Sequence, residues 1–519
     1  MIYVTNTYVI IPTIDYYKDY VNSLLSYFSK TDPETMVKVE FVQIIEDALY
    51  VPIGYLGFLQ LDLSRPDVTD LRTNRIPGLI PDNDSDELIR KSLPGIILRD
   101  DQVLAVRKAL EKNSGIYQMA TGSGKTEVIC ATINHWCGRL NLPLNIIILE
   151  PTVNLVKQTI ARLARYDIEA TEYGATREVG GIQVTHPISL FNDLAINPDH
   201  LKDVNVLICD EGHHLTAVTW RTLLLSAPNL EVRLAFSASV IEQDHIQPIL
   251  NPVLLDLEEF LVVGAVGPLV LNFTPAYYIK NKVLATPTVI RLYNPADEFV
   301  PPSTKKQNIK YNGVDYAAIK KIRLSSDTRM KQAVLAIQQF SDLGLKILVL
   351  VDTKLSAAKL LTNLHDLGLS KYARLLFGMQ KSLRYNPSTG LTEPDDQNAL
   401  TLFETGRINI LIGTSVLYEG TDLPLLDVVM LYSVGVAQRV FIQTVGRVLR
   451  RGKSGNFAYI VDFTDHNCNV LSRHSKTRRY MYETIIGVQS RHIFDDVQPH
   501  QIPYIYSNME DGVNNDCNK

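Results

Sequence analysis

The sequence predicts an α/β fold with two tandem, doubly wound parallel-sheet domains, preceded by a small N-terminal α+β domain. Short, continuous apolar runs recur along the chain, at 145–150, 205–211, 232–239, 346–352, 408–415, 426–433 and 456–463. Segments with helical periodicity separate these runs. Apolar strands that alternate with helices are typical of parallel sheets that are buried on both faces.

The composition is that of a globular protein, with 46% hydrophobic and 21% charged residues in 519 positions. No apolar run is long enough to span a bilayer, and the N-terminal residues lack the basic start of a secretory signal. The five cysteines are scattered without a CxxC pair, which fits a reducing compartment and argues against a zinc site or a disulfide framework. We therefore expect a cytoplasmic protein without a membrane partner.

Turn signals and composition divide the chain. The segment 41–59 reads as one or two strands followed by a short helix, and it belongs to the N-terminal domain. The expected divisions are an accessory domain at 1–93, a first parallel-sheet domain at 94–255, a linker or insertion at 256–319, a second parallel-sheet domain at 320–480 and a partly disordered tail at 481–519.

The charge is distributed unevenly, although the net charge is only −5. Residues 1–90 hold 7 Lys and Arg against 14 Asp and Glu, whereas residues 320–480 hold 22 against 13. A basic second half is consistent with binding a polyanion. The acidic N-terminal segment does not look like an electrostatic platform for nucleic acid.

The stretch MATGSGKTEVI, at 119–129, follows an apolar run and precedes a helical pattern. Its glycines let the backbone turn so that N–H groups face phosphate oxygens at a helix N-terminus. Lys125 can reach the β- and γ-phosphates, and Thr126 can hold Mg²⁺. Met119 stands where the common pattern has its first glycine. The sequence thus predicts an ATP and Mg²⁺ site that includes Thr121, Gly122, Ser123, Gly124, Lys125 and Thr126.

Two adjacent acids end the apolar run at 205–211. At the C-terminal edge of a parallel sheet, Asp210 would hold Mg²⁺ through water and Glu211 would orient or deprotonate the attacking water. The following pair, His213 and His214, makes a poor metal site because adjacent side chains diverge, so we expect hydrogen-bonding roles for them. Together with the phosphate loop, the two acids predict a nucleoside triphosphatase.

The stretch 438–452 has the pattern of an amphipathic helix. At about 100° per residue, Gln443, Arg447 and Arg450 share one face, and apolar residues occupy the other. Guanidinium groups suit planar recognition of phosphate or carboxylate, but a solvated face with ion pairs is an alternative that the helix alone leaves open.

In order along the chain, these motifs resemble those of superfamily 2 DExH-type helicases. The remaining matches are LRDDQ at 98–102, EPTVNLVKQ at 150–158, VTHPISL at 184–190, FSAS at 236–239, GTSVLYEGTDLP at 413–424 and QTVGRVLRRG at 443–452. The resemblance implies two RecA-like domains. It also implies that Arg447 and Arg450 are arginine fingers that reach, from the second domain, a γ-phosphate bound on the first, with Gln443 assisting.

The same resemblance implies further site residues. Gln102 would read the adenine, and Gly420 and Asp422 would complete the nucleotide site. Hydroxyls and backbone amides at four motif positions, Thr152, Thr185, Thr353 and Thr414, would grip successive phosphates of a nucleic acid. Taken singly, each threonine is equally well explained as a hydroxyl at a strand end.

The segment from VGAVGPLV to VIRLY, which ends at Tyr293, resembles the bridging region of XPB-like proteins and of UvsW-type phage recombination helicases. This likeness implies a DNA helicase or translocase, with 3′ to 5′ polarity, that remodels branched recombination or repair intermediates. We expect it to act as a monomer on single-stranded, duplex or branched DNA, with recombination or replication proteins as partners. An RNA helicase, or the motor subunit of a restriction or defence complex, remains an alternative. The N-terminal segment is rich in tyrosines, such as Tyr16, Tyr17 and Tyr55. We expect them to be core residues, and stacking on bases is the alternative.

Overall fold

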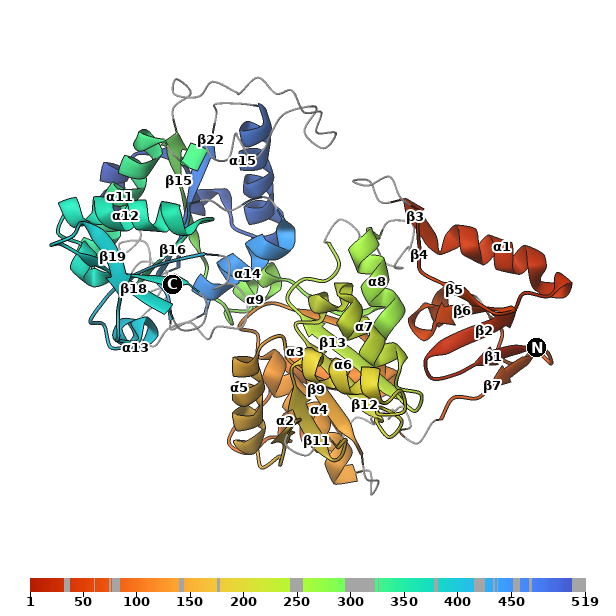
Figure 1. The fold of residues 1–519 in the computed structure, drawn as a ribbon. Helices are drawn as coiled ribbons and strands as arrows, with labels where there is room; N and C mark the ends of the chain where they lie inside the picture. The colour runs from red at the N-terminus through yellow and green to blue at the C-terminus, as the bar shows by residue number, and fades with distance from the viewer. Residues whose placement is uncertain are drawn as a thin grey trace, which may run out of the picture. The chain divides into compact units, whose positions relative to one another are not determined.

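The protein is described in a computed structural model, whose fold is shown in Figure 1. The structure describes residues 1–31, 38–59, 61–73, 76, 85–139, 144–174, 178–242, 255–294, 323–324, 326–377, 381–414, 425–432, 435, 437–450, 458–465 and 469–505. The chain divides into two compact units, Met1–Phe273 and Thr274–Lys519. Each unit contains a parallel sheet covered by helices, so the predicted α/β class is confirmed.

A five-stranded sheet begins the first unit, in the order β5-β6-β2-β1-β7. Its strands are β1 (Ile2–Val4), β2 (Tyr8–Pro12), β5 (Gln43–Ile45), β6 (Ala48–Pro52) and β7 (Val68–Asp70). All pairs are antiparallel except β1 with β7. Helix α1 (Lys18–Tyr27), a small hairpin of β3 (Ser29–Thr31) and β4 (Lys38–Glu40), and the 3₁₀ helix η2 (Ile53–Phe58) complete it. The strands and the short helix predicted at 41–59 are thereby confirmed.

A seven-stranded parallel sheet forms the centre of the first unit, in the order β10-β11-β9-β12-β13-β8-β14. The strands are β8 (Ser114–Met119), β9 (Ile146–Leu149), β10 (Thr171–Glu172), β11 (Ile182–Thr185), β12 (Val206–Asp210), β13 (Val232–Ser237) and β14 (Leu269–Phe273). The residues of β9 and β13 are all buried, because both faces of the sheet are covered.

Alternate residues of these strands join two different hydrophobic clusters, one on each face of the sheet. The first face packs against α2 (Ser85–Arg90), α3 (Asp100–Lys112), α4 (Lys125–Arg139) and α5 (Val153–Ala164). The second face packs against α6 (Pro187–Ile196), α7 (Val218–Leu225) and α8 (Leu257–Val266). Ile146 and Ile148 point to the first cluster, and Ile147 and Leu149 to the second. This is the doubly wound arrangement that the apolar runs predicted.

The second unit contains a nine-stranded sheet in the order β19-β18-β17-β20-β16-β21-β22-β15-β23. The strands are β15 (Thr288–Asn294), β16 (Ile347–Leu350), β17 (Ala373–Phe377), β18 (Lys381–Asn386), β19 (Leu391–Pro394), β20 (Ile410–Gly413), β21 (Val428–Leu431), β22 (Tyr459–Asp465) and β23 (Ile493–Val497). The pairings from β17 to β23 are parallel, and β18 with β19 adds an antiparallel hairpin at one edge.

Helices also cover the second sheet. They are α9 (Pro275–Lys280), α11 (Asp327–Asp342), α12 (Lys354–Asp366), α13 (Ala399–Glu404), α14 (Gln438–Val448) and α15 (Asn469–Met481), which continues as the π-helix η9 (Tyr482–Ile486). Helices α11 and α12 share one hydrophobic cluster with alternate strand residues, while α14 and α15 contact β22.

The structure differs from the expected divisions in two places. The segment 256–319, expected as a linker or insertion, contributes α8 and β14 to the first unit and β15 to the second. The tail expected at 481–519 contains β23, which pairs with β15. Both segments complete sheets, since β14 covers the edge of β8 and β23 covers the edge of β15.

The N-terminal sheet is packed closely on α8 of the same unit. Tyr55 is 1% exposed, and its hydroxyl donates to the Phe260 carbonyl at 2.6 Å. A Cβ on Gly264 would lie 2.6 Å from the Tyr55 ring, and one on Gly54 would lie 2.2 Å from the Val263 carbonyl oxygen. Tyr55 is therefore a core residue and cannot stack on bases. Tyr16 is 76% exposed, so stacking stays a prediction for that residue.

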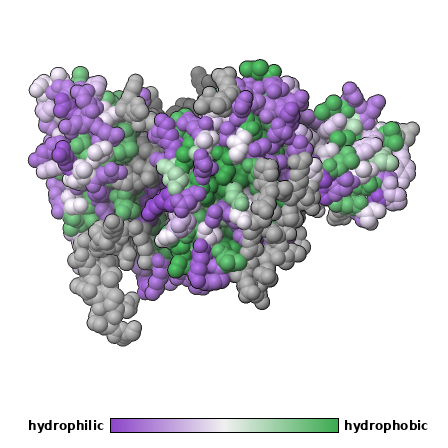
Figure 2. Space-filling model, turned by 90° about the horizontal axis from the view of Figure 1, so that it is seen from below, coloured by the Kyte–Doolittle hydropathy of each residue, from purple (hydrophilic) through white to green (hydrophobic). Residues whose placement is uncertain are grey.

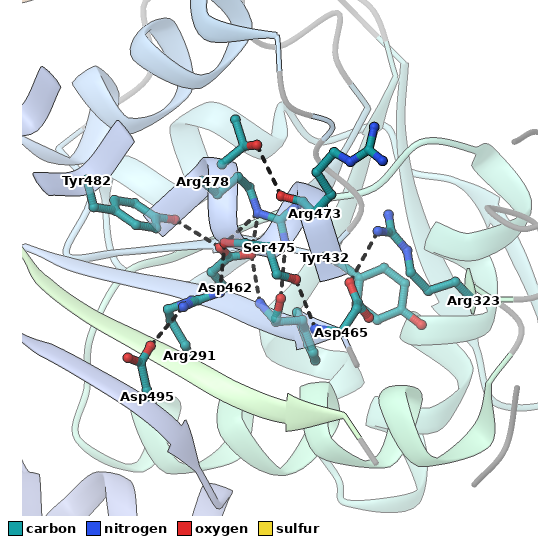
Figure 3. A network of polar contacts seen from close by, with 12 residues as sticks. Arg291, Arg323, Tyr432, Asp462, Asp465, Arg473, Ser475, Arg478, Tyr482 and Asp495 are labelled. Atoms are coloured by element: carbon teal, nitrogen blue, oxygen red, sulfur yellow. Dashed lines mark hydrogen bonds and ion pairs between the residues drawn. The ribbon is translucent and has the colours of Figure 1, made fainter. Parts of the chain in front are cut away.

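Two fully buried aspartates of β22 organise the polar interior of the second unit (Figure 3). Asp462 accepts from Arg478 Nε at 2.9 Å, and Asp465 pairs with Arg329 Nη1 at 2.9 Å and Arg323 Nη1 at 3.3 Å. Removing one partner of such a buried pair lowers the stability of the fold strongly, because the other partner is left charged, buried and without compensation.

None of the helices among the described residues is long and apolar enough to cross a membrane. Figure 2 shows hydrophilic and hydrophobic residues interspersed over the described part of the face seen from below.

Replacement of Asp465 tests the importance of this buried network. Asp465→Ala would strand the Arg329 and Arg323 guanidinium groups and should destabilise the second unit by about 3–5 kcal/mol. Hydrogen exchange of the β22 amides, followed by mass spectrometry, measures this loss directly. The control is Glu393→Gln, which weakens the half-exposed pair with Arg384 and should change protection little. Equal protection of β22 in Asp465→Ala and wild type would contradict the assignment.

Candidate functional site

The predicted phosphate loop lies between β8 and α4, as its strand–loop–helix context requires. Gly122 and Gly124 have φ angles of 80° and 87°, in the left-handed region that glycine adopts without strain. Ser123 is fully buried, and Lys125 begins α4 with 9% of its side chain exposed. Thr121 and Thr126 are half-buried. The N–H groups at this helix start provide a binding site for phosphate.

Gln102 holds the loop from the side. Its Nε2 donates to the carbonyls of Ser123 at 3.4 Å and Gly124 at 3.3 Å, and its Oε1 accepts from Arg99 N at 3.1 Å. A Cβ on Gly124 would lie 2.4 Å from Gln102 Nε2, so this contact requires glycine at 124. The structure therefore brings Gln102 to the nucleotide loop, and its reading of adenine stays a prediction.

The two predicted acids lie at the C-terminal end of β12, which is separated from β8 by the single strand β13. Asp210 is the last residue of the strand. Glu211 follows with a φ of 51°, in the left-handed region that non-glycine residues rarely adopt, and its N–H contacts Asp210 Oδ1 at 2.9 Å. Gly212 has no space for a side chain, because a Cβ would lie 2.7 Å from Ala235 Cβ. Such local strain is a feature of functional sites.

Glu211 connects the phosphate loop to the FSAS motif. Its Oε1 lies 3.3 Å from Lys125 Nζ, and its Oε2 lies 3.4 Å from both Ser237 Oγ and His213 Nδ1. His213 Nδ1 and Ser237 Oγ are themselves 3.0 Å apart. The expected hydrogen-bonding role of His213 is confirmed. His214 stacks on Trp220, with ring centroids 5.3 Å apart.

Glu150 is a site residue that motif reading did not single out. It follows β9 directly, is 1% exposed, and its Oε1 accepts from Thr159 Oγ1 at 2.6 Å. Burial, and then the charges of Asp210 and Glu211, raise the pKa of Glu150 well above its ordinary value. The sequence did contain a signal for Glu150 as a site residue. It directly follows the buried strand β9, which neighbours β12, and the ends of parallel strands meet at one edge of a sheet.

The other two carboxyl groups are shifted in opposite directions. Burial raises the pKa of Asp210 to about 6, the Glu211 charge adds to the rise, and the Lys125 ammonium opposes it. Burial alone would also raise the pKa of Glu211. The charges of Lys125 and His213 outweigh this effect and hold the pKa of Glu211 below its usual range. Glu211 is thus a carboxylate at neutral pH, as a group that orients water must be.

The residues at this edge suit Mg²⁺. The ion prefers oxygen ligands and is commonly held by one or two carboxylates, water and substrate phosphates. Asp210 supplies a carboxylate whose pKa is raised mainly by burial and further by the charge of Glu211. A bound cation would stabilise the ionised form of both acids. Among the described residues, no group of three or more His, Cys, Asp and Glu side chains is placed to hold a metal by itself.

The threonines predicted to grip nucleic acid follow strands, and two of them cap helices. Thr152 Oγ1 accepts from Leu155 N at 3.3 Å at the start of α5, and Thr353 Oγ1 accepts from Ser356 N at 3.1 Å at the start of α12. Thr414 follows β20 and is half-buried. Thr185 is 2% exposed and donates to the His186 carbonyl at 3.1 Å, which leaves its hydroxyl little surface for a phosphate. Their contact with nucleic acid stays a prediction.

The predicted arginine helix is α14, and it packs as expected on its apolar side. Phe441 is fully buried and lies against the Tyr482 ring, with centroids 4.9 Å apart. Gln443 is 6% exposed, and Arg447 lies in the last helical turn. The helix ends at Val448, so Arg450 comes just after it rather than on its face. Its role, and that of Arg447, stay predictions, and Gly420 and Asp422 lie outside the described residues.

Comparison with known protein families gives a match in each of the two parallel-sheet units. Residues 95–242 match the family described as "Type III restriction enzyme, res subunit", and residues 340–452 match "Helicase conserved C-terminal domain". The chain belongs to the superfamily 2 helicases. This membership indicates an ATP-dependent helicase, and the phosphate loop and acids lie within the first matched segment.

Relatives of this helicase include proteins named for DNA and for RNA. Putative helicase 22 of Sulfolobus islandicus filamentous virus is 23% identical over 56% of this chain and 48% of its own length. The DNA 3′-5′ translocase XPB2 of Sulfurisphaera tokodaii is 22% identical over 69% and 79%. The ATP-dependent rRNA helicase RRP3 of Candida glabrata is 24% identical over 70% and 65%. The helicase therefore spans about half the length of the viral relative.

Solved structures agree with the fold. The fragment structure of a putative HsdR subunit of a type I restriction enzyme from Vibrio vulnificus covers 93% of this chain and 82% of its own, with a TM-score of 0.55 and 17% identity. The T4 UvsW structure covers 93% of this chain and 97% of its own at 17% identity, but its TM-score of 0.41 is too low to assign a subtype. The UvsW-like subtype therefore stays a proposal.

The raised pKa of Asp210 predicts a pH-dependent stability. A folded-state pKa of about 6 lies above the ordinary value, so the contribution of Asp210 to stability is full below roughly pH 4 and is lost as the pH rises through 6. Asp210→Asn should therefore raise the thermal midpoint at pH 7.5, without nucleotide or Mg²⁺, and the gain should shrink towards pH 4.5. Thermal unfolding over this range measures it. Asp199→Asn, at an exposed position, is the control. A gain that does not depend on pH would contradict the assigned environment.

Proposed function

We propose that this helicase is a DNA motor that couples ATP hydrolysis to translocation and unwinds or branch-migrates recombination or repair intermediates. The observation that supports the ATPase part is the contact of Lys125 with Glu211, 3.3 Å apart. It joins the phosphate loop to the acid that would activate water, at the sheet edge where α/β proteins bind ligands.

The residues of the first unit have distinct roles in hydrolysis. The loop N–H groups and Lys125 would hold the β- and γ-phosphates, so Lys125 would exchange Glu211 for phosphate oxygens. Glu211 would then orient the attacking water, while Asp210 and Thr126 would hold Mg²⁺. A bound Mg²⁺ would neutralise charge on the phosphate oxygens.

His213 and Ser237 would connect Glu211 mechanically to the rest of the unit. Both lie within 3.4 Å of Glu211 Oε2, and Ser237 ends β13. A movement of Glu211 during turnover would therefore break or shift its contact with Ser237 and displace the segment that follows.

The second unit would supply Arg447 and Arg450 to the γ-phosphate, with Gln443 beside them. Guanidinium groups stabilise the negative charge of phosphoryl transfer, and arginines in this role are worth about 10³-fold or more in rate. The support is the order of the motifs and the place of α14 after a central strand of the second sheet. This arrangement would also couple occupancy by ATP to closure between the units.

DNA is the favoured track because the relative named a DNA translocase shares more of its own length with this chain, 79%, than the rRNA helicase does, 65%. The excess of positive charge in residues 320–480 supports a polyanion partner but does not distinguish DNA from RNA. An RNA helicase is the second candidate, on the strength of the rRNA helicase relative. The motor of a restriction complex is the third, since the first matched family carries that description.

Hydrolysis should depend on residues from both units. Glu211→Gln should lower the ATP turnover rate about 10³-fold or more while ATP still binds, and Arg450→Ala should lower it by a comparable factor with binding largely intact. A coupled ATPase assay and nucleotide binding measure the two effects separately. Glu172→Gln, an exposed acid of the first unit, is the control. Turnover at the wild-type rate by Glu211→Gln would remove its assigned role.

The choice of nucleic acid can be read from stimulation of ATP turnover. Single-stranded DNA, duplex, a fork, a four-way junction and RNA of equal nucleotide content are compared at several salt concentrations. We expect branched DNA to give the largest stimulation, and the stimulation to fall steeply with salt because phosphate contacts release counterions. Stronger stimulation by RNA would favour the second candidate.

A further inference from the structure

The first unit contains a cleft of about 420 Å³ at the edge of its sheet opposite Lys125. Its walls come from two parts of the chain that are far apart in sequence. The N-terminal sheet and its connections contribute Asn6, Gly54 and Arg72. The parallel sheet contributes Lys112 just before β8, Arg233 at the start of β13 and Pro268 just before β14. The cleft is therefore independent of the triphosphate site.

Arg233 is an unusual wall residue because it is 4% exposed and carries a charge. Its Nη2 donates to the carbonyl oxygens of Asn6 and Leu230, the latter at 3.1 Å. Its Nη1 is buried and has no hydrogen-bond partner, and burial is the cause of its altered pKa, without a contribution from a described carboxylate. Burial lowers the pKa of Arg233 to about 10, so the guanidinium stays charged at neutral pH. A buried charge without a counterion is unfavourable unless something compensates it.

The neighbouring groups favour an anion over a cation. Asp70 is already paired with Arg72 at 2.6 Å, and Glu231 Oε2 accepts from Ile76 N at 2.7 Å. Lys112 is exposed at the rim and adds a second cation. Among its described residues the wall therefore holds three cationic side chains, those of Arg72, Lys112 and Arg233, against two carboxylates, those of Asp70 and Glu231.

The wall also offers an acceptor. Asn113 has a φ of 55° and donates through Nδ2 to the Ile76 carbonyl at 2.9 Å, while its Oδ1 is buried without a hydrogen-bond partner. An occupant would therefore accept from Arg233 and donate to Asn113. A hydrogen phosphate or a phosphate ester with a hydroxyl has both kinds of group, and 420 Å³ lies within the range of small-molecule sites.

We propose that this cleft binds the phosphate group of a small molecule, held by Arg233 and Lys112. Arginine is suited to phosphate because its planar fork gives two parallel donors. The occupant would contact the N-terminal sheet and the start of β13 at once, so binding would strengthen the attachment of that sheet. Strand β13 leads from Arg233 to Ser237, which contacts Glu211.

Equilibrium dialysis of the full chain with labelled inorganic phosphate tests the site. The phosphate loop can also bind phosphate, so the measurements use Lys125→Ala as the background. This variant should retain about one bound phosphate per chain, and addition of Lys112→Ala or Arg233→Lys should weaken it tenfold or more. Lys202→Ala, an exposed lysine away from the cleft, should leave it unchanged. Lys112→Ala is the decisive variant if Arg233→Lys fails to fold, because Lys112 is exposed.

Loss of all phosphate binding in Lys125→Ala alone would overturn the proposal, as would equal binding with and without Lys112→Ala and Arg233→Lys. Competition by AMP in the Lys125→Ala background would identify a phosphate ester as the ligand. Binding of inorganic phosphate that AMP does not displace would identify the free ion. The Lys125→Ala background also separates this test from the ATPase proposal, since it removes the latter's key cation.

Discussion

The Lys125 ammonium is the interaction on which the chemistry of the first unit depends. It lies among Glu150, Asp210 and Glu211. These acids repel one another because they stand at the ends of two neighbouring parallel strands, β9 and β12. A doubly wound sheet brings strand ends together whether or not their charges agree. The ammonium stabilises the charged form of both Asp210 and Glu211. Burial still raises the pKa of Asp210, whereas at Glu211 the charges of Lys125 and His213 outweigh burial. The division of roles between Asp210 and Glu211 is therefore a property of their surroundings.

The attachment of the N-terminal sheet depends on a different constraint, the close approach of backbone to backbone. Gly54 and Gly264 have no side chains where the neighbouring groups come within 3 Å of the position that a Cβ would take. The Tyr55 ring fills the remaining space, with Phe28 and Phe260 at centroid distances of 4.7 and 4.9 Å. Because the two parts share one hydrophobic cluster, the sheet belongs to the body of the first unit and is not held on a free linker.

Apolar runs were sufficient to predict the central strands of both parallel sheets, because a strand buried on both faces has a distinct pattern. Predicted runs contain β9, β12, β13, β16, β20 and β21, and the run at 456–463 covers most of β22. The motif at 119–126 and the acids at 210 and 211 were predicted as one site, and the structure brings them together. The sequence did not predict β14 and β15, since a likeness to a bridging region hid their strand pattern, nor the hairpin of β18 and β19, whose alternation is short and polar.

Other site features depend on tertiary neighbours that no local pattern encodes. Glu150 is unremarkable as a residue after a strand, and only burial beside two further acids changes its protonation. Likewise, Gln102 could be placed near the nucleotide by its motif, but its contact with the carbonyls of Ser123 and Gly124 depends on how α3 packs beside the loop. Asp462 lies inside the apolar run 456–463 and Asp465 lies just after it, and nothing in the pattern reveals the arginines that pair with them.

The position of β15 has a consequence for how the second unit is made. Thr288 pairs with Tyr459, and Val289 pairs with Ile493, so a strand synthesised early lies between two that are synthesised late. The backbone N–H and C=O groups on both edges of β15 stay without strand partners until more than 150 further residues have left the ribosome. Contacts so distant along the chain close slowly. Nascent chains would therefore pass through a stage in which one half is folded and the other presents an open strand, an opportunity for chaperones and for misassociation alike.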